Sequence, residues 1–206
     1  MRTVYLIRHG VAMEREEFRG DDLERPLTET GEKKARQAME GLARLLRTEK
    51  QQPRIISSPA RRAQQTAEIF RKVWGKEAEV QIRDSIKPGA TALDYLDAMI
   101  YFPLKEDRVL LIFGHEPEIS ETCALVSNVH RFQGFYAPLW KTGERNSEIL
   151  AELQHWLPSD EGEFTVVEGS LQFQIKKSGV VRIQLDADGA MIQGIYSPSV
   201  LRALSQ

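Results

Sequence analysis

The chain has little cysteine, no long apolar run and no excess of charge of one sign. Its single cysteine, Cys123, excludes an internal disulfide framework and a structural zinc site built on cysteines. The longest strongly apolar run, residues 109–113, is far too short to cross a bilayer. With 28 basic and 30 acidic residues, the formal net charge of -2 offers no bulk attraction to nucleic acid or to an acidic membrane. An anion site in this chain must therefore be a local cluster of arginine and histidine.

The N-terminal residues have no signal-peptide core, because a strand-like run at residues 4–7 is followed directly by Arg8 and His9. We therefore expect a cytoplasmic protein with neither a nucleic-acid nor a membrane partner. The 206 residues, of which 28% are charged and 41% apolar, suit a single domain that is long enough to bury a real core.

Strand and helix patterns alternate through the first two-thirds of the chain, which is typical of an α/β layered fold. Helical spacing of apolar residues begins after Thr28, a predicted N-cap. The predicted elements are a strand at 4–7, a helix from 29 to about 47, a strand at 54–57, a helix through 63–74 that ends at Gly75, a strand at 80–82, a helix through 93–100, a strand at 109–113 and a helix through 119–126.

The last third has a different pattern. Alternation at residues 171–175 and 181–185 predicts two antiparallel strands, closed into a hairpin by residues 176–179. A turn at residues 188–189 precedes a final strand near 191–195, so the sheet is predicted to be mixed, with an antiparallel edge. Residues 129–169 fit neither pattern. We interpret them as an insertion in a single domain spanning 1–206, because roughly 40 residues alone make a poor core.

Three motifs follow predicted strands, at the positions where open α/β sheets place their ligand sites. Arg8-His9-Gly10 comes directly after the first strand. A Ser-Ser-Pro sequence at 57–59 leads into a helix that carries Arg61 and Arg62. Gly-His-Glu-Pro at 114–117 follows the most apolar strand. The fold can therefore bring these motifs to one edge of the sheet from distant positions in the chain.

Two arginines and two histidines around one point would make a pocket for a phosphoryl group. Guanidinium forks match phosphate oxygens and stay charged at any working pH. A neutral imidazole could attack phosphorus and form a covalent phospho-enzyme, and nearby cations would disfavour its protonation. The remaining cations would stabilise the charge of the transition state. This chemistry needs no cofactor and no metal, and the sequence has no carboxylate cluster suited to Mg²⁺.

Together, the sequence LIRHG at 6–10, SSP at 57–59 followed by Arg62-Ala63 and Thr66, and Gly114-His115 resemble the histidine phosphatase superfamily, also called phosphoglycerate mutase-like. Within it the chain is most similar to SixA-type phosphohistidine phosphatases, on the sequence RPLT at 25–28, the short spacing before His115 and the closing residues 196–198. The resemblance covers nearly the whole chain except about residues 129–169. It implies a three-layer α/β/α sandwich with a mixed, mostly parallel sheet and a C-terminal antiparallel hairpin.

The resemblance also implies roles for individual residues. His9 is the predicted nucleophile, and Arg8, Arg62 and His115 are the predicted ligands of the phosphoryl group. Arg25 is a candidate ligand of the phosphate or the substrate at the pocket edge, with pairing to a nearby acid as the alternative. The acids that could pair with it are Asp21, Asp22 and Glu24.

The stretch between Arg62 and His115 is short and offers Asp84 as its only obvious acid, whereas mutases and small-molecule phosphatases of the superfamily usually carry a larger segment and an acid there. An alkyl phosphate ester needs a proton on its leaving oxygen, whereas the P–N bond of phosphohistidine is labile and makes a smaller demand. We therefore predict a metal-independent phosphatase that acts on phosphohistidine in a protein, such as a histidine-phosphotransfer domain.

Two alternatives stay open. The first is a small-molecule phosphatase that acts on a phosphorylated metabolite and uses Glu116 or Asp84 as its general acid. The second is a non-catalytic module that binds a phosphorylated protein. Other polar residues have structural interpretations: Arg61 as a solvated charge, Ser57 and Ser58 as backbone hydrogen-bond partners, Cys123 as inert core, and His130 and His155 as ordinary surface or packing residues.

Overall fold

A computed structural model describes residues 2–75, 78–102, 108–127, 174–186 and 189–206. In this part of the chain, six strands form one sheet in the order β3-β2-β4-β1-β5-β6. The first four strands run parallel, and β5 and β6 are antiparallel to their neighbours, so the sheet is mixed as predicted. The strands are β1 (Arg2–Arg8), β2 (Gln52–Ser57), β3 (Val80–Ile82), β4 (Arg108–Gly114), β5 (Val180–Asp186) and β6 (Gly189–Tyr196).

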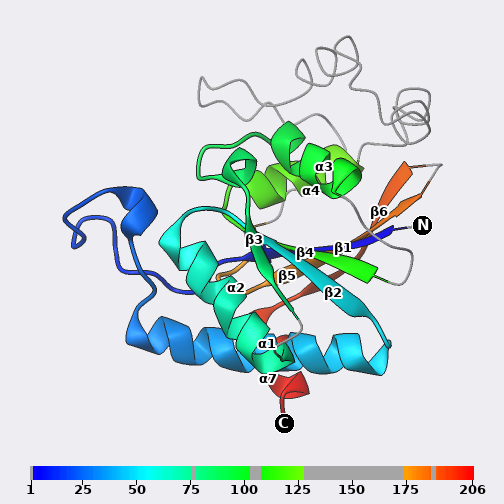
Figure 1. Cartoon of the computed structure of the whole chain (residues 1–206), viewed down its shortest axis with the longest axis horizontal. Coiled ribbons are helices and arrows are strands. Elements are labelled where there is room, and N and C mark those ends of the chain that lie inside the picture. The colour runs from blue at the N-terminus through cyan, green and yellow to red at the C-terminus, as the bar shows by residue number, and fades with distance from the viewer. Residues whose placement is uncertain (1, 76–77, 103–107, 128–173, 187–188) are drawn as a thin grey trace.

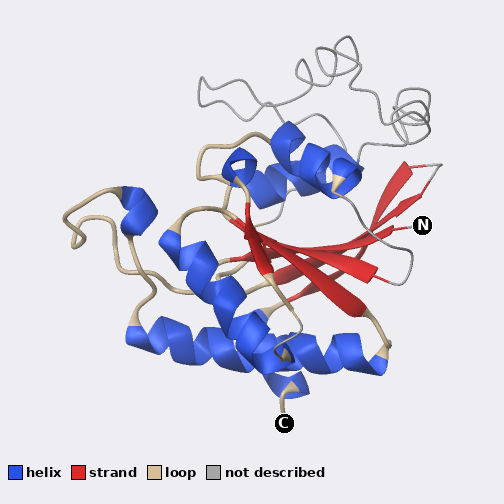
Figure 2. Cartoon of the chain, in the orientation of Figure 1, coloured by secondary structure: helices blue, strands red, loops and turns tan. Residues whose placement is uncertain are grey.

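Helices cover both faces of the sheet and make a three-layer α/β/α sandwich (Figures 1 and 2). On one face lie α1 (Glu29–Thr48), α2 (Arg61–Trp74) and α7 (Pro198–Leu204). On the other face lie α3 (Ala92–Tyr101) and α4 (Glu118–Ser127). Two short 3-10 helices, η1 (Asp22–Glu24) and η2 (Asp84–Ile86), lie in the connections. This architecture confirms the predicted fold class.

Local sequence signals account for most helix boundaries. The Thr28 hydroxyl oxygen accepts the Gly31 N–H at 2.9 Å, which confirms the predicted N-cap of α1. The helix α2 ends at Gly75, whose φ of 133° is accessible to glycine. The helix α7 is an addition to the predicted elements. Ser197 caps it and Pro198 occupies its first turn, a pairing that is typical of helix starts.

The predicted hairpin between residues 171–175 and 181–185 is wrong in its described part. Residues 174–179 form no strand, and β5 pairs with β1 and β6 instead. The physical reason is that this segment is bound to the end of β1: the Ser178 N–H donates to the carbonyls of Arg8 and His9, and the Arg8 N–H donates to the Gly179 carbonyl. The antiparallel hairpin at the sheet edge is formed by β5 and β6.

The proposed insertion at 129–169, with His130 and His155, lies outside the described residues. Cys123 is fully buried in the core between the sheet and α4, as predicted. Within the described ranges, no helix combines the length and apolar character that a membrane span requires.

We predict that Gly41→Ala destabilises the protein, because a Cβ at Gly41 would overlap the Leu201 carbonyl oxygen where α7 packs on α1. Overpacking of this kind costs about 1–3 kcal/mol, whereas an unhindered Gly→Ala change within a helix is stabilising. Urea unfolding monitored by circular dichroism would measure the change. The exposed Gln37→Ala on the same helix is the matched control, and a Gly41→Ala variant more stable than wild type would refute the close contact.

Candidate active site

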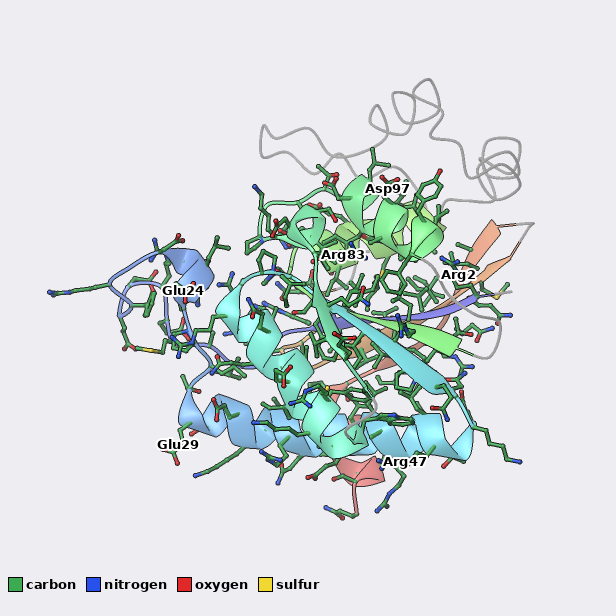
Figure 3. The ribbon with its side chains drawn as sticks, in the orientation of Figure 1. Arg2, Glu24, Glu29, Arg47, Arg83 and Asp97 are labelled. Carbon is green, nitrogen blue, oxygen red and sulfur yellow. The ribbon has the colours of Figure 1, made fainter. Side chains whose placement is uncertain are left out.

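The three motifs meet at the carboxyl edge of the parallel strands. In the sheet register, Arg8 of β1 lies beside Gly114 of β4, and Ser57 of β2 lies beside Phe113. Backbone bonds continue past the strand ends: the His9 N–H donates to the Gly114 carbonyl at 3.1 Å. Figure 3 shows the η1 segment, with Glu24, on the side toward which β1 runs, opposite the side where Arg2 begins the strand.

His9 is 7% exposed and lies at the centre of this edge. Its Nδ1 lies 2.7 Å from the Gly10 carbonyl oxygen. A carbonyl only accepts, so Nδ1 carries the proton and Nε2 keeps its lone pair. Burial, followed by the charges of Arg62 and Arg8, lowers the pKa of His9 to about 3. The ring is therefore a neutral imidazole with a free nucleophilic nitrogen at neutral pH.

His115 is 2% exposed, and its ring centroid lies 5.2 Å from that of His9. Its Nε2 lies 2.7 Å from Ser58 Oγ, which also accepts the Ala60 N–H. Among the described residues the Ser58 hydroxyl has no other acceptor for its proton, so we assign that proton to the bond with Nε2, and this assignment puts the imidazole proton on Nδ1. Burial, followed by the neighbouring His9 and Arg62, lowers the pKa of His115 to about 2.

Arg8 and Arg62 both use their terminal nitrogens for protein partners. Arg8 Nη1 donates to the Ile175 carbonyl at 2.6 Å. Arg62 is 4% exposed and donates from Nη1 to the Asp22 carbonyl and from Nη2 to the Asp22 carboxylate at 3.0 Å. In each arginine, Nε is buried and has no hydrogen-bond partner among the described residues, and the same is true of His115 Nδ1.

Arg25 pairs with Asp22, one of the acids considered as its partner. Its Nε donates to Asp22 Oδ1 at 2.8 Å, and its Nη1 donates to the Met13 carbonyl at 2.6 Å. Because Asp22 also binds Arg62, its carboxylate joins the two arginines. Burial alone would raise the pKa of Asp22, but the hydrogen bond from Arg25 and the charge of Arg62 outweigh it and lower the pKa. This pairing holds Arg25 beside the cluster.

The two acids proposed from the sequence lie in different environments. Glu116 follows His115 and is half-buried, with Oε1 accepting the Ile175 N–H at 2.7 Å and Oε2 accepting the Ser120 N–H at 3.2 Å. Burial raises the pKa of Glu116. Asp84 is exposed at the start of η2, after the edge strand β3, and β2 and β4 separate that strand from β1.

Glu118 is a further acid near the site that the sequence reasoning missed. It is 3% exposed, and its Oε1 accepts the Gly89 N–H at 2.6 Å. Its Oε2 is buried and makes no hydrogen bond within the part of the chain that the structure describes. Burial lowers the pKa of Arg62, and the charges of Asp22 and Glu118 oppose that shift. Glu118 lies just after the Gly-His-Glu-Pro motif at 114–117, and no sequence pattern distinguished it as a site residue.

Two more residues shape the site without having been predicted to do so. Thr66 of α2 is fully buried, and its Oγ1 accepts the Gly10 N–H at 3.0 Å and donates to the Arg62 carbonyl at 2.7 Å. Lys177 contributes a positive charge that lowers the pKa of His9, after burial and the two arginines. The Ser-Ser-Pro and Arg-Ala-x-x-Thr spacing contained a signal for Thr66, whereas Lys177 was assigned to a hairpin turn.

The described residues contain no group of three or more histidine, cysteine, aspartate or glutamate side chains that could hold a metal ion. What they do hold is a neutral imidazole near two arginines and a second histidine that have buried, unpartnered nitrogens. This arrangement suits transfer of an anionic tetrahedral group to nitrogen, because the donors would stabilise charge on its oxygens.

We predict that His9 and His115 stay neutral from pH 8 to pH 5, well below the ordinary imidazole pKa near 6.5. Imidazole resonances followed by NMR across this range, assigned with single variants, should not shift. Titration of either ring with a midpoint near 6.5 would contradict the lowered pKa values. The unfolded chain binds protons at both rings below about pH 6.5, whereas the folded protein binds them only near pH 3 at His9 and near pH 2 at His115. The two rings should therefore make the fold less stable as pH falls through this window.

We also predict that Thr66→Val lowers the free energy of unfolding by about 1–3 kcal/mol, because the Gly10 N–H would be left buried without a partner. The same change would loosen the backbone of Gly10, whose carbonyl orients His9. Thr66→Ser keeps the hydroxyl and is the control. Denaturant unfolding measures both variants, and equal stability of Thr66→Val and wild type would argue against the role of this hydrogen bond.

Residues 4–87 match the family model of the histidine phosphatase superfamily (branch 1). No curated protein sequence matches the chain. Among solved structures, a SixA protein from Agrobacterium tumefaciens is 19% identical, with a TM-score of 0.60 over 96% of this chain and 98% of that one. A protein histidine phosphatase SixA complexed with tungstate is 18% identical, with a TM-score of 0.62 over 97% and 99%. A mycobacterial glucosyl-3-phosphoglycerate phosphatase is 14% identical, with a TM-score of 0.56 over 96% and 100%.

At these identities the likeness to solved structures concerns the fold. The family match covers the first and second of the three motifs, including Arg8, His9 and Arg62. The third motif, with His115, lies at the edge of the sheet beside them. The chain is thus similar to the histidine phosphatase superfamily over residues 4–87, and it shares its fold with solved phosphatases over most of its length.

Proposed function

We propose that this protein removes the phosphoryl group from phosphohistidine in a protein substrate, without a metal, through a covalent phosphohistidine at His9. One observation carries the proposal: His9 Nε2 is unprotonated, and three residues near His9 each have a buried N–H donor that lacks a partner in the described part of the chain. Those donors are Arg8 Nε, Arg62 Nε and His115 Nδ1. Buried polar groups are almost always hydrogen-bonded, so the three donors are suited to the oxygens of a bound phosphoryl group.

In the first step, the lone pair of His9 Nε2 forms a bond to phosphorus while the P–N bond of the substrate breaks. The electron pair of that bond goes to the departing imidazole nitrogen, which takes a proton from solvent. The His9 ring gains positive charge as its bond to phosphorus forms. The Gly10 carbonyl, which accepts the Nδ1–H, stabilises that charge and fixes the ring orientation.

In the second step, water attacks the phosphorus of phospho-His9. A P–O bond forms, the P–N bond to His9 breaks, and its electron pair returns to Nε2. The proton lost by water passes to the phosphate product or to solvent. Arg8, Arg62 and His115 stabilise the negative charge on the phosphoryl oxygens in both steps, because their N–H groups are fixed before the substrate arrives.

The environment of the candidate acids supports a phosphoramidate over an alkyl ester. Both carboxylate oxygens of Glu116 accept backbone N–H groups, and Asp84 is exposed after an edge strand. A labile P–N bond needs less help from an acid than a P–O bond to an alkoxide does. The alternative interpretation of the sequence is a small-molecule phosphomonoesterase that acts on a metabolite and uses one of these two residues as its general acid.

The neighbouring structures are consistent with a phosphoryl pocket. One of them is a protein histidine phosphatase that binds tungstate, a tetrahedral oxyanion of the same shape as phosphate. Another acts on glucosyl-3-phosphoglycerate, a metabolite. The fold therefore hosts both substrate classes, and the choice between them depends on the site of this chain.

We predict that the protein releases phosphate from a phosphorylated histidine-phosphotransfer domain and from phosphoramidate faster than from sugar phosphates, and that a chelator leaves the rate unchanged. Acid-free quenching with labelled substrate should trap a phosphoryl group on wild type but not on His9→Ala. Arg62→Ala should lower kcat/KM by about 10²–10³-fold, the typical loss when one donor to a developing anion is removed.

The neighbouring Arg61→Ala is the matched control, because Arg61 is exposed and Arg62 is 4% exposed. It should retain wild-type rates. Faster turnover of alkyl phosphates than of phosphoramidates would favour the metabolite phosphatase. Binding of phosphorylated protein with neither turnover nor a trapped intermediate would favour the non-catalytic module.

A further inference from the structure

Glu116 connects two segments that are far apart in the chain. It precedes α4, and its Oε2 accepts the N–H of Ser120 in the first turn of that helix. Its Oε1 reaches across to accept the N–H of Ile175 at 2.7 Å. The carboxylate therefore ties the segment at 174–179 to the end of β4.

Ile175 in turn holds Arg8. Its carbonyl accepts Arg8 Nη1 at 2.6 Å, and its side chain is 2% exposed in the core between the sheet and α4. The backbone of Ile175 is thus fixed by three contacts: the Glu116 carboxylate, the Arg8 guanidinium and its own packing. Displacing the segment would move the acceptor that aims the guanidinium.

We infer that Glu116 is a positioning residue for Arg8, acting through the backbone of Ile175 rather than as a proton donor. The inference rests on the proposed function, in which Arg8 Nε binds a phosphoryl oxygen. Arg8 Nε is buried with no partner among the described residues, so its direction depends on the bond made by Nη1. A guanidinium is planar, and fixing one terminal nitrogen limits where Nε–H can point.

Electrostatics supports the same pairing. Burial lowers the pKa of Arg8, and the charge of Glu116 opposes that shift. A buried cation without a nearby anion is costly, and the carboxylate offsets that cost without occupying Nε. Both carboxylate oxygens already accept N–H groups, which suits an anion that serves as an anchor.

A double-mutant cycle on kcat/KM, with Glu116→Ala, Arg8→Ala and the double variant, tests the inference. Loss of a hydrogen bond to a charged group costs about 10–150-fold, so Glu116→Ala should lose on the order of tenfold to a hundredfold in wild type. In the Arg8→Ala background the same change should add at most about twofold, because its effect passes through Arg8. Inorganic phosphate should inhibit Glu116→Ala more weakly than wild type.

The conservative variant separates positioning from proton donation. Glu116→Gln keeps an oxygen for the Ile175 N–H and should retain activity to within about threefold of wild type, since one of the two anchoring bonds can persist. The loss in Glu116→Ala should be the same for phosphoramidate, p-nitrophenyl phosphate and an alkyl phosphate, because Arg8 acts on the phosphoryl group common to all three. Glu121→Ala, a change of charge on the same helix, is the control and should leave the rates unchanged.

Additive losses in the cycle would overturn the inference. So would a loss in Glu116→Gln that grows with the pKa of the leaving group, because that dependence identifies a general acid. If Arg8→Ala itself kept wild-type activity, the proposed function would fail, and this result is distinct from a failure of coupling between Glu116 and Arg8. Circular dichroism and unfolding curves of every variant verify that each one is folded.

Discussion

The site depends on positive charge held out of water beside two uncharged imidazoles. Arg62 and His115 are almost completely buried, and His9, whose ring centroid lies 5.2 Å from that of His115, has little exposure. Protonating either ring there would bury another cation next to a guanidinium. Burial is the main cause that keeps both rings neutral, followed by the two arginines for His9 and by His9 and Arg62 for His115. The same burial leaves three N–H donors without partners in the described part of the chain. Burial is thus the cause both of the low pKa values of the two histidines and of the unpaired N–H donors. A bound anion of the right size would accept hydrogen bonds from those donors and balance the positive charge.

The parallel strands supply the precision that this chemistry needs. Apolar residues bury β1 and β4 on both faces, and their register brings Arg8 beside Gly114 before either motif leaves the sheet. At Gly114 a Cβ would overlap the Tyr95 hydroxyl, which accepts the His115 N–H. The absence of a side chain at Gly114 therefore lets Tyr95 of α3 come close enough to bind the His115 N–H. The proposed catalytic groups thus lie at strand ends, and the surrounding segments hold them by hydrogen bonds.

The sequence predicted the features that depend on local interactions and missed those that depend on contacts between distant segments. Apolar runs and cap residues are local, and they predicted the parallel strands, the N-cap of α1 and the end of α2 at Gly75. The motif order placed His9, Arg62 and His115 at one edge because parallel strands end together. The path of residues 174–179 was wrong because their alternation is also typical of a strand, and only the end of β1 decides how their backbone pairs. Glu118 and the contact of Asp22 with Arg62 were missed because these contacts cross between elements.

The two arginines share one arrangement, although they come from different elements. Arg8 binds the Ile175 carbonyl with Nη1 and has Glu116 nearby, whereas Arg62 binds Asp22 with both terminal nitrogens. In both, an acid offsets the cost of burying the charge, and the Nε–H is left over. An arginine whose entire guanidinium group faced an empty pocket would have no hydrogen-bond partner until the substrate bound. Here protein contacts fix each guanidinium before the substrate binds and leave its Nε–H unpaired. Substrate binding therefore need not supply the free energy to order the guanidinium. Preorganised donors of this kind stabilise a transition state more effectively than mobile ones, because they need no reorganisation when charge develops.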